Sequence, residues 1–306
     1  MTVIPGATTS AGSAQTQTVT GLPAAPRDTS PHARQRRRWR LRPGLLLASL
    51  FLLWLAAAVV APGVLASADP YTVNPSRSFE APGAAATFGT DDSGADIYSR
   101  IVHGAATSLY IGLGATAIGV VGGTAIGLLA GLNGRLVEAS VMRVLDVTLA
   151  IPEILLALVV IGIIGGGTEN AILAIGAGSI AYYARITRAQ THLVRRSGYV
   201  EAARTLGLPA GKVLFTHVIP NVMKPVLVLA TIGVGSAIGA GASLSFLGLG
   251  TPPPAPEWGA MLSVGRNFIS NAPWMITIPA AFLVATVLSI TVIGRELRRR
   301  AEGRVQ

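Results

Sequence analysis

Few side chains in this 306-residue sequence could do chemistry, because only 12% of the residues are charged. Two carboxylates, Asp146 and Glu153, lie near the inner end of a long apolar segment. Ionisable groups inside a membrane are costly, which makes them functional candidates by default. Asp146 is also one helical turn from Arg143, so a structural ion pair explains it at least as well. An intramembrane enzyme needs several such groups at one depth, and only these two carboxylates come near that arrangement.

The sequence does not predict a metal site or a nucleotide-binding site. Cysteine is absent and the histidines are scattered, so we expect no metal site; the four histidines are His32, His103, His192 and His217. The segment GLPAGKV, which begins at Gly207, looks like a phosphate-binding loop. That motif requires glycine where Leu206 stands and serine or threonine where Val213 stands. The energy for any ATP-driven step must therefore come from a separate subunit.

One polar stretch, Glu201–Pro220 (EAARTLGLPAGKVLFTHVIP), interrupts the apolar sequence. Tyr199–Leu206 is a short helix-forming run, and Gly207 can adopt the left-handed conformation of a helix C-cap. Pro209 suits the first turn of a second helix, which we expect to end near Pro220. The product would be a helix–glycine–helix bracket. A force on such a bracket would move the membrane helices at both of its ends.

The rest of the sequence supplies those membrane helices. A chain with 51% hydrophobic residues and a mean hydropathy of +0.56 has too much apolar surface for a soluble domain. We expect an all-α membrane protein. Apolar runs long enough to cross a bilayer predict six spans: Leu45–Leu65, Ala105–Gly131, Val144–Gly165, Ala171–Ile186, Pro225–Gly248 and Ile276–Ile293.

The basic residues predict the orientation of these spans. The formal net charge is +10, and most of the arginines lie beside predicted spans on one side, with only Arg77, Arg100 and Arg266 on the other. The positive-inside rule therefore places both termini and the Glu201–Pro220 stretch in the cytoplasm. Because the charges are spread over separate juxtamembrane segments, topology and anionic membrane lipid explain them without nucleic acid.

Several separated motifs resemble one family. Glu201-Ala202-Ala203, followed by Gly207 and by His217–Asn221, resembles the E-A-A loop of binding-protein-dependent ABC importer permeases. The C-type permease subunit of dipeptide, oligopeptide and nickel importers is similar over four further stretches: Phe88–Gly112, Arg143–Leu158, Ser245–Leu262 and Asn271–Ala280. The resemblance covers roughly residues 35–298. The sequence departs from the family pattern at Ala95 and Arg295, where the family usually has arginine and aspartate.

The resemblance implies a type I ABC importer permease in the bacterial plasma membrane, with six membrane helices and a cytoplasmic helix-turn-helix coupling loop. It implies a homologous B-type permease, two ATPase subunits and an extracytoplasmic binding protein as partners. Di- or oligopeptides are the expected cargo, with nickel or haem as the alternative; an ATP-independent carrier is an alternative of another class. ATP and magnesium would bind to the ATPases, so we expect no catalytic residue and no cofactor in this chain. The expected coupling residues are Glu201, Ala202, Ala203, Leu206, Gly207, Pro209, His217 and Pro220.

Two further groups of candidates follow from the resemblance. Small residues on the fifth span, Gly235, Gly239 and Ser243, would line the translocation path or make room for a neighbouring helix. Segments 90–100 and 251–266 would face the binding protein. The contact candidates there are Asp91, Asp92, Asp96, Arg100 and Trp258, with Asp96 and Arg100 spaced as a helical ion pair and Trp258 as an interface anchor.

Glycines in the second span recur every four residues, at Gly119, Gly123, Gly127 and Gly131. Such a row allows another helix to come close. A homodimer contact is the more specific interpretation, but packing inside a six-helix bundle is the commoner use of such a face.

The chain as a whole divides into five regions. The composition of residues 1–33 predicts a disordered cytoplasmic tail. Residues 34–68 form a basic anchor and the first membrane helix; a cleavable signal is the alternative, although its apolar run would be unusually long. Residues 69–104 are expected to be extracytoplasmic and to include an amphipathic helix. The permease core, with five spans and the coupling loop at 197–221, covers 105–298, and a cytoplasmic tail covers 299–306.

Overall fold

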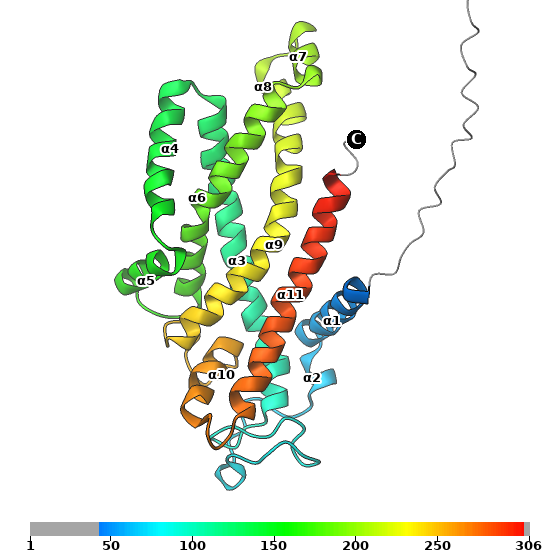
Figure 1. Cartoon of the computed structure of the whole chain (residues 1–306), viewed down its shortest axis with the longest axis vertical. Helices are drawn as coiled ribbons and strands as arrows, with labels where there is room; N and C mark the ends of the chain where they lie inside the picture. Colours follow the sequence, from blue (N-terminus) through cyan, green and yellow to red (C-terminus); the bar gives the residue numbers. More distant parts are fainter. Residues whose placement is uncertain (1–42, 303–306) are drawn as a thin grey trace, which may run out of the picture. The chain divides into compact units, whose positions relative to one another are not determined.

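The computed structural model describes residues 43–302, and helices dominate this part of the chain (Figure 1). The described range contains no β-strand and one isolated β-bridge, between Thr90 and Asp96. The predicted tail at 1–33 and the basic run at 34–42 lie outside it. The α-helices are α1 (Pro43–Val60), α2 (Pro62–Leu65), α3 (Ile97–Leu132), α4 (Arg135–Ala150), α5 (Glu153–Ile164), α6 (Thr168–Arg195), α7 (Gly198–Thr205), α8 (Ala210–Val213), α9 (Ile219–Phe246), α10 (Trp258–Gly265) and α11 (Trp274–Glu302).

The long helices match the predicted spans in order. Within residues 43–302, four helical stretches are long and apolar enough to cross a membrane: α1, α3, Ala210–Phe246 and α11. The pair α4 and α5 passes the same test together, bent by 93°. Helix α6 corresponds in position to the remaining predicted span, but it is more polar, with Tyr182 and Arg185 in its middle, and it is not among the helices that pass this test. The predicted all-α membrane fold is confirmed.

The third predicted span, Val144–Gly165, is not one straight helix. It contains the break between α4 and α5, where Ile151 has extended backbone angles (φ −88°, ψ 128°) and Pro152 follows. A proline disfavours helical geometry in the residue before it and cannot donate a backbone hydrogen bond. Pro152 therefore ends α4 and starts α5 in a new direction.

Helices α3 and α6 pack along the row of glycines on α3. A Cβ atom added at Gly123 would lie 2.5 Å from the Tyr183 Cβ, and one added at Gly127 would lie 2.5 Å from the Ala184 carbonyl oxygen. The absence of side chains on this face lets the two backbones approach closely. The row is therefore covered within the chain. Packing inside the bundle was the right interpretation, and the homodimer interpretation is wrong.

Two membrane helices continue through prolines and beyond the predicted apolar runs. Helix α9 begins at Ile219 and contains Pro225, where the fifth span was predicted to start. Helix α11 contains Pro279 and extends to Glu302, so part of the predicted tail at 299–306 is helical. Neighbouring helices supply the packing that lets a membrane helix tolerate an internal proline.

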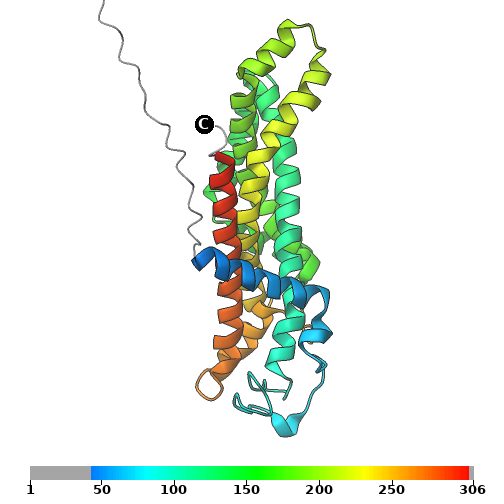
Figure 2. The same ribbon diagram turned by 90° about the vertical axis from the view of Figure 1, so that its right-hand side faces the viewer.

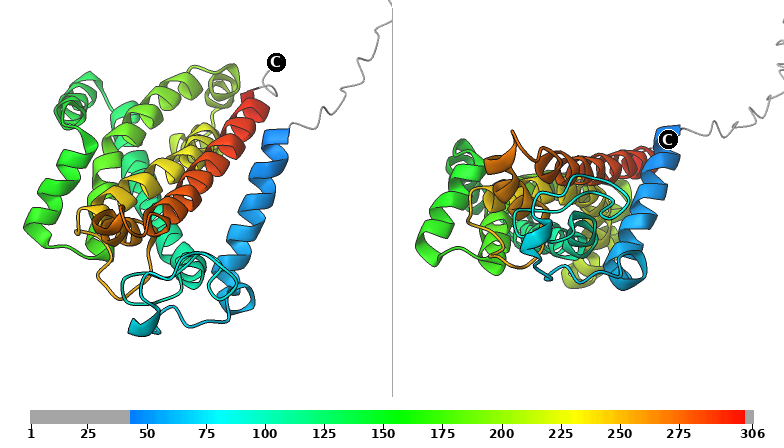
Figure 3. Two further views of the ribbon diagram at one scale, coloured as in Figure 1. Left: turned by 60° about the horizontal axis from the view of Figure 1, so that its bottom comes forward. Right: turned by 90° about the horizontal axis from the view of Figure 1, so that it is seen from below.

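The segment before α3 is mostly irregular. Its regular part within residues 66–96 is one 3-10 turn at Pro75–Arg77, and the helix predicted in 69–104 is the start of α3 itself. Helix α1 crosses α3 and α11 instead of running alongside them (Figure 2). Phe282 of α11 contacts α1, with its ring 5.1 Å from that of Trp54. Figure 3 shows α1 and the α4–α5 pair at opposite edges of the helical body.

Candidate functional site

The bracket, defined as residues 197–221, lies at one tip of the helical body (Figure 1). Its first helix, α7, ends in a Schellman motif, in which the Gly207 N–H donates to the Arg204 carbonyl (2.9 Å) and the Leu208 N–H donates to the Ala203 carbonyl (3.2 Å). Gly207 has a φ of +77°, which glycine adopts without steric strain. The glycine cap that the sequence predicts is confirmed.

The second helix of the bracket does not end near Pro220, and that prediction is wrong. Helix α8, with Pro209 as its N-cap residue, continues through a π-helical turn at Leu214–Val218 into α9. In a regular α-helix, the ring of Pro220 would clash with the preceding turn. The wider π turn, in which the Ile219 N–H donates to the Leu214 carbonyl, removes that clash. The bracket is therefore continuous with a membrane helix.

The bracket has an apolar interior of its own. Ala203, one of the predicted coupling residues, is only 7% exposed and belongs to this interior. Leu128 and Leu132, from the end of α3, pack against it. Its buried members are Val194, Val200, Ala203, Val213, Val218 and Val222. Burial of apolar side chains from α6, α7 and α9 in one cluster fixes the bracket to the membrane helices.

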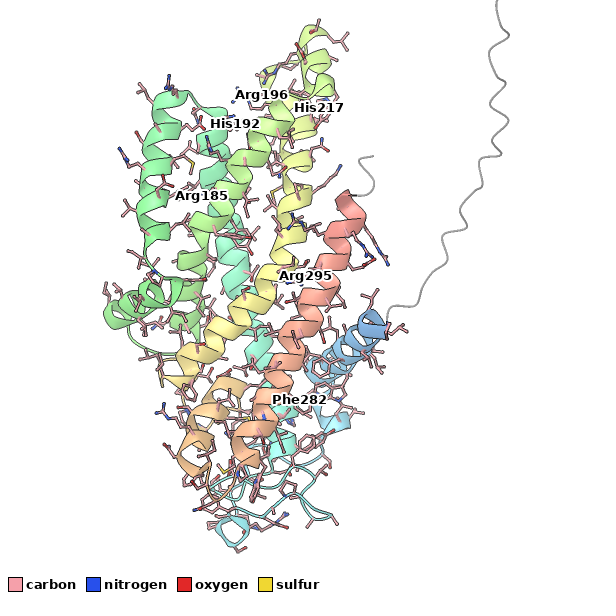
Figure 4. All side chains as sticks on the ribbon, in the orientation of Figure 1. Arg185, His192, Arg196, His217, Phe282 and Arg295 are labelled. Carbon is pink, nitrogen blue, oxygen red and sulfur yellow. The ribbon has the colours of Figure 1, made fainter. Side chains whose placement is uncertain are left out.

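The outward side of the bracket combines charge with exposed apolar side chains. Glu201 and Ala202 are exposed, and Leu206 is 79% exposed. Phe215, which the sequence analysis did not single out, is 71% exposed on the same element. Large apolar side chains in an exposed position mark interaction surfaces. Phe215 directly follows two other apolar residues, Val213 and Leu214, so no sequence signal marks it as the exposed one. His217 is half-buried on the π turn, in the upper part of Figure 4.

Ion pairs tie α4 to α6 between the bracket and the α4–α5 break (Figure 4). Asp146 pairs with Arg185 of α6 and not with Arg143, so the predicted pair within one helix is wrong. Glu138 accepts hydrogen bonds from Arg188 Nε (2.6 Å) and His192 Nε2 (2.9 Å). The spacing along one helix predicts Arg143 as the partner of Asp146, but in the fold Arg185 of α6 lies beside Asp146.

A cavity of about 750 Å³ opens among α3, the α4–α5 break, α6, α9 and α11. Gly233 and Ser236 of α9 line it, whereas the predicted path residue Gly235 faces α11, where a Cβ added to it would lie 3.4 Å from the Val287 carbonyl oxygen. Gly239 has open space on its Cβ side, and the Ser243 hydroxyl donates to the Gly239 carbonyl (2.9 Å). Neither of these two residues lines the cavity.

The opposite end holds the predicted binding-protein contacts, and most of them have structural partners. Trp258 is fully buried, and its indole N–H donates to the Ile101 carbonyl (3.0 Å), so it cannot be a surface anchor. Asp96 caps α3 by accepting from the Ser99 N–H (2.8 Å). Arg100 contacts Asp91 instead of Asp96 (Nε to Oδ2, 3.6 Å), which corrects the predicted pair.

Asp92 is the exposed member of that group. Partial desolvation, and secondarily the adjacent Asp91 carboxylate, raise the pKa of the Asp92 carboxyl. The sequence analysis missed Glu257, which is 1% exposed and caps α10 by accepting from the Gly259 and Ala260 N–H groups (both 2.8 Å). Glutamate is not among the preferred N-cap residues, so no local sequence rule marks Glu257 for this role.

Solved structures share this fold. An inward-facing methionine ABC transporter, MetNI, aligns with a TM-score of 0.54 and 23% identity, over 66% of this chain and 95% of that one. An amino acid ABC transporter aligns with a TM-score of 0.52 and 20% identity, over 66% of this chain and 94% of that one. These likenesses concern the fold alone.

Sequence relatives are closer. The dipeptide transport system permease protein of Alkalihalophilus pseudofirmus is 40% identical over 83% of both chains. The di/tripeptide permease of Pseudomonas aeruginosa is 38% identical over 83% of this chain and 86% of its own length. The glutathione transport system permease of Pectobacterium atrosepticum is 37% identical over 89% and 92%, respectively.

The sequence profile of one family, described as "Binding-protein-dependent transport system inner membrane component", matches residues 123–305. The match includes the bracket, the cavity-lining part of α9 and all of α11. Together with relatives at up to 40% identity over most of their length, it shows that this chain is a multi-pass transport subunit and belongs to the family of binding-protein-dependent transport system inner membrane components.

Proposed function

We propose that this chain is one of two permease subunits of an ATP-driven importer of di- or oligopeptides. Three of its relatives are named as dipeptide, di/tripeptide and glutathione permeases, and all of these cargoes are short peptides. A homologous permease of the B type, two ATPases and a binding protein outside the membrane complete the proposed complex. Import of nickel or haem by the same architecture is the second candidate, carried by the resemblance of the motifs.

The bracket carries the proposal. Its exposed face, with Glu201, Leu206 and Phe215, offers an apolar and charged surface to an ATPase. Its interior joins α3, α6 and α9 in one apolar cluster. A displacement of the bracket would therefore move these helices together, because packed elements shift as rigid bodies. This arrangement fits a coupling element between an external motor and a membrane gate.

ATP binding and hydrolysis belong to the partner ATPases in this proposal, and the chain acts without catalysis and without a cofactor. Binding of ATP would draw the ATPases together and pull the bracket, and hydrolysis would let it return. The proposed orientation puts the bracket and both termini in the cytoplasm and the segment 66–96 outside the bacterial plasma membrane. It follows from the distribution of arginine.

The cavity is the part of the translocation path that this subunit would contribute. It is bordered by α3, α6 and α9, the three helices that the bracket interior joins. Movement of the bracket would change the separation of its walls. Ser236 and Gly233 of α9, which line the cavity, replace Gly235, Gly239 and Ser243 as the residues that we expect the cargo to pass.

The coupling role is tested by charge changes on the exposed face. Glu201→Arg and Leu206→Glu are introduced into the complete transporter, reconstituted in proteoliposomes with its binding protein. We expect ATP-dependent uptake of radiolabelled dialanine to fall at least about tenfold, since a buried unpaired charge at an interface costs several kcal/mol. Uptake at the wild-type rate in both variants, with the ATPases still bound, would remove the proposal. Uptake that persists without the ATPases would indicate a carrier.

A further inference from the structure

Four charged residues line the cavity, namely Glu153, Arg295, Arg298 and Arg299, and two of them, of opposite charge, have no partner among the described residues. Glu153, at the start of α5, and Arg295, on α11, both line it. Neither forms an ion pair or a side-chain hydrogen bond with any residue in the range 43–302. Three carboxylates on the neighbouring helices α4 and α11 are paired: Asp146 with Arg185, Glu138 with Arg188, and Glu296 with Arg299 and Arg300.

Glu153 is an exposed residue whose side chain contacts α6. Its Cγ lies 3.4 Å from the Cβ position of Gly178 on α6, so the side chain rests against that helix beside the cavity. Pro152 directs the start of α5 toward this place. A carboxylate in the first turn of a helix stabilises that helix through its dipole. This effect does not explain why Glu153 lines the same cavity as an unpaired guanidinium.

Hydroxyl groups contribute to the wall of the same cavity. Thr116 is 6% exposed, and its hydroxyl has no hydrogen-bond partner among the described residues. The Tyr183 hydroxyl approaches Gly233 so closely that a Cβ added to this glycine would overlap it. Both Thr116 and Tyr183 line the cavity. Buried polar groups without partners are uncommon in folded proteins, and a ligand is one way to satisfy them.

We propose that this cavity is a binding site for a zwitterionic short peptide in transit, with Glu153 receiving the α-ammonium group and Arg295 the α-carboxylate. The inference rests on the proposed function and goes beyond it by naming the groups of the cargo that are recognised. A peptide with charged ends loses hydration when it enters a membrane, and charge-assisted hydrogen bonds offset that loss. The guanidinium fork matches a carboxylate geometrically.

The chemistry of the cavity favours a peptide over a metal ion. Glu153 is the one carboxylate among the described residues that line it, and they include no histidine. A divalent transition metal requires several oxygen, nitrogen or sulfur ligands at one point. The volume of about 750 Å³ falls within the range of roughly 300–1,000 Å³ that holds small molecules.

Binding to the membrane complex without its binding protein tests this assignment. The permeases and ATPases are placed in nanodiscs of phosphatidylcholine and phosphatidylglycerol, so that no lipid offers a primary ammonium group. Radiolabelled dialanine is displaced by dialanine, by N-acetyl-dialanine, which lacks the ammonium, or by dialanine amide, which lacks the carboxylate. We expect both blocked peptides to compete on the order of tenfold more weakly than dialanine.

Each variant should lose one preference and keep the other. Glu153→Gln should bind N-acetyl-dialanine as well as dialanine and still discriminate against the amide. Arg295→Gln should do the reverse. Because each preference is a ratio measured within one variant, reduced folding or assembly does not imitate the result. Glu169→Gln and Arg143→Gln, which change exposed charges outside the cavity, should keep both preferences.

Three results would overturn the assignment: equal competition by all three peptides in the wild type, both preferences intact in both variants, or no saturable binding at about 10 mM dialanine. Uptake with ATP and the binding protein separates this failure from a failure of the proposed function. If the wild-type transporter imports dialanine, but the membrane complex binds the free and the blocked peptides equally well, only the proposed site is refuted. A transporter that imports no peptide refutes the function as well.

Discussion

The bracket and the opposite end of the molecule are built by different means. In the bracket, hydrogen bonds join residues within one turn, such as Gly207 to Arg204, and the interior consists mainly of valines. At the opposite end, hydrogen bonds join distant parts of the chain. The Trp258 indole donates to the Ile101 carbonyl, and the Trp274 indole donates to the Thr90 carbonyl (3.1 Å).

This difference fits the proposed role of the bracket, which is to transmit motion, whereas the opposite end fixes helices to each other. A locally built bracket keeps its shape when it is displaced, since its contacts travel with it. Long-range polar contacts hold α3, α10 and α11 in one register, and they break if those helices shift. We therefore expect substitutions at the opposite end to reduce stability and substitutions on the bracket surface to reduce transport.

The largest loss of stability is expected from Trp258→Ala. The side chain is fully buried, and its removal leaves a cavity and abolishes the hydrogen bond from the indole to the Ile101 carbonyl, at a cost of about 3–5 kcal/mol. Thermal unfolding of the purified transporter measures it. Leu247→Ala, at a position 51% exposed, is the control and should have little effect. Equal melting temperatures for the two variants would contradict the role given to Trp258.

Glu257→Ala should cost less, about 1–3 kcal/mol, because it removes the cap of α10 and leaves buried donors without a partner. The Ser108 hydroxyl, which donates to Glu257 Oε1 (3.2 Å), belongs to the same group. In a double-mutant cycle with Ser108→Ala, measured by thermal unfolding, the two losses should not add. Additive losses would mean that the two side chains act independently.

Gly207→Val tests the bracket itself. Valine would have to adopt a φ of +77°, which costs about 1–2 kcal/mol and disfavours the turn. Gly211→Ala is the matched control: Gly211 is helical, no atom lies within 4 Å of its Cβ position, and alanine should be neutral or slightly stabilising. The stability of the transporter and the uptake of dialanine are measured for both. A transport defect in Gly211→Ala alone would refute the importance of the turn.

Phe215→Glu should change stability least, by no more than about 0.5 kcal/mol, because the side chain is 71% exposed. If the exposed face contacts an ATPase, however, ATP-dependent uptake should be lost and the ATPases should dissociate more readily during purification. Phe215→Leu keeps an apolar side chain and should retain most of the uptake. Full activity of Phe215→Glu would exclude this residue from the coupling contact.

Local rules predicted a good part of this structure. The order of the membrane helices, the α7 helix and the Gly207 cap follow from apolar runs and from the conformational freedom of glycine, which act within a few residues. Two other predictions failed, one because of an unexpected backbone turn and one because of a distant partner. The π turn overrides the expected stop at Pro220, and Arg185, 39 residues away, takes the place of Arg143 beside Asp146.

By itself, the sequence determined the class of the protein, the order of its membrane helices, the place of the bracket and the family motifs. Only the tertiary structure decided that Trp258 is buried, that Gly235 faces α11, and that Glu153 and Arg295 line one cavity. The physical reason is that apolarity and backbone preference belong to single residues and short runs. Burial and the choice of a charge partner depend on which helices meet, and that depends on the packing of the whole bundle.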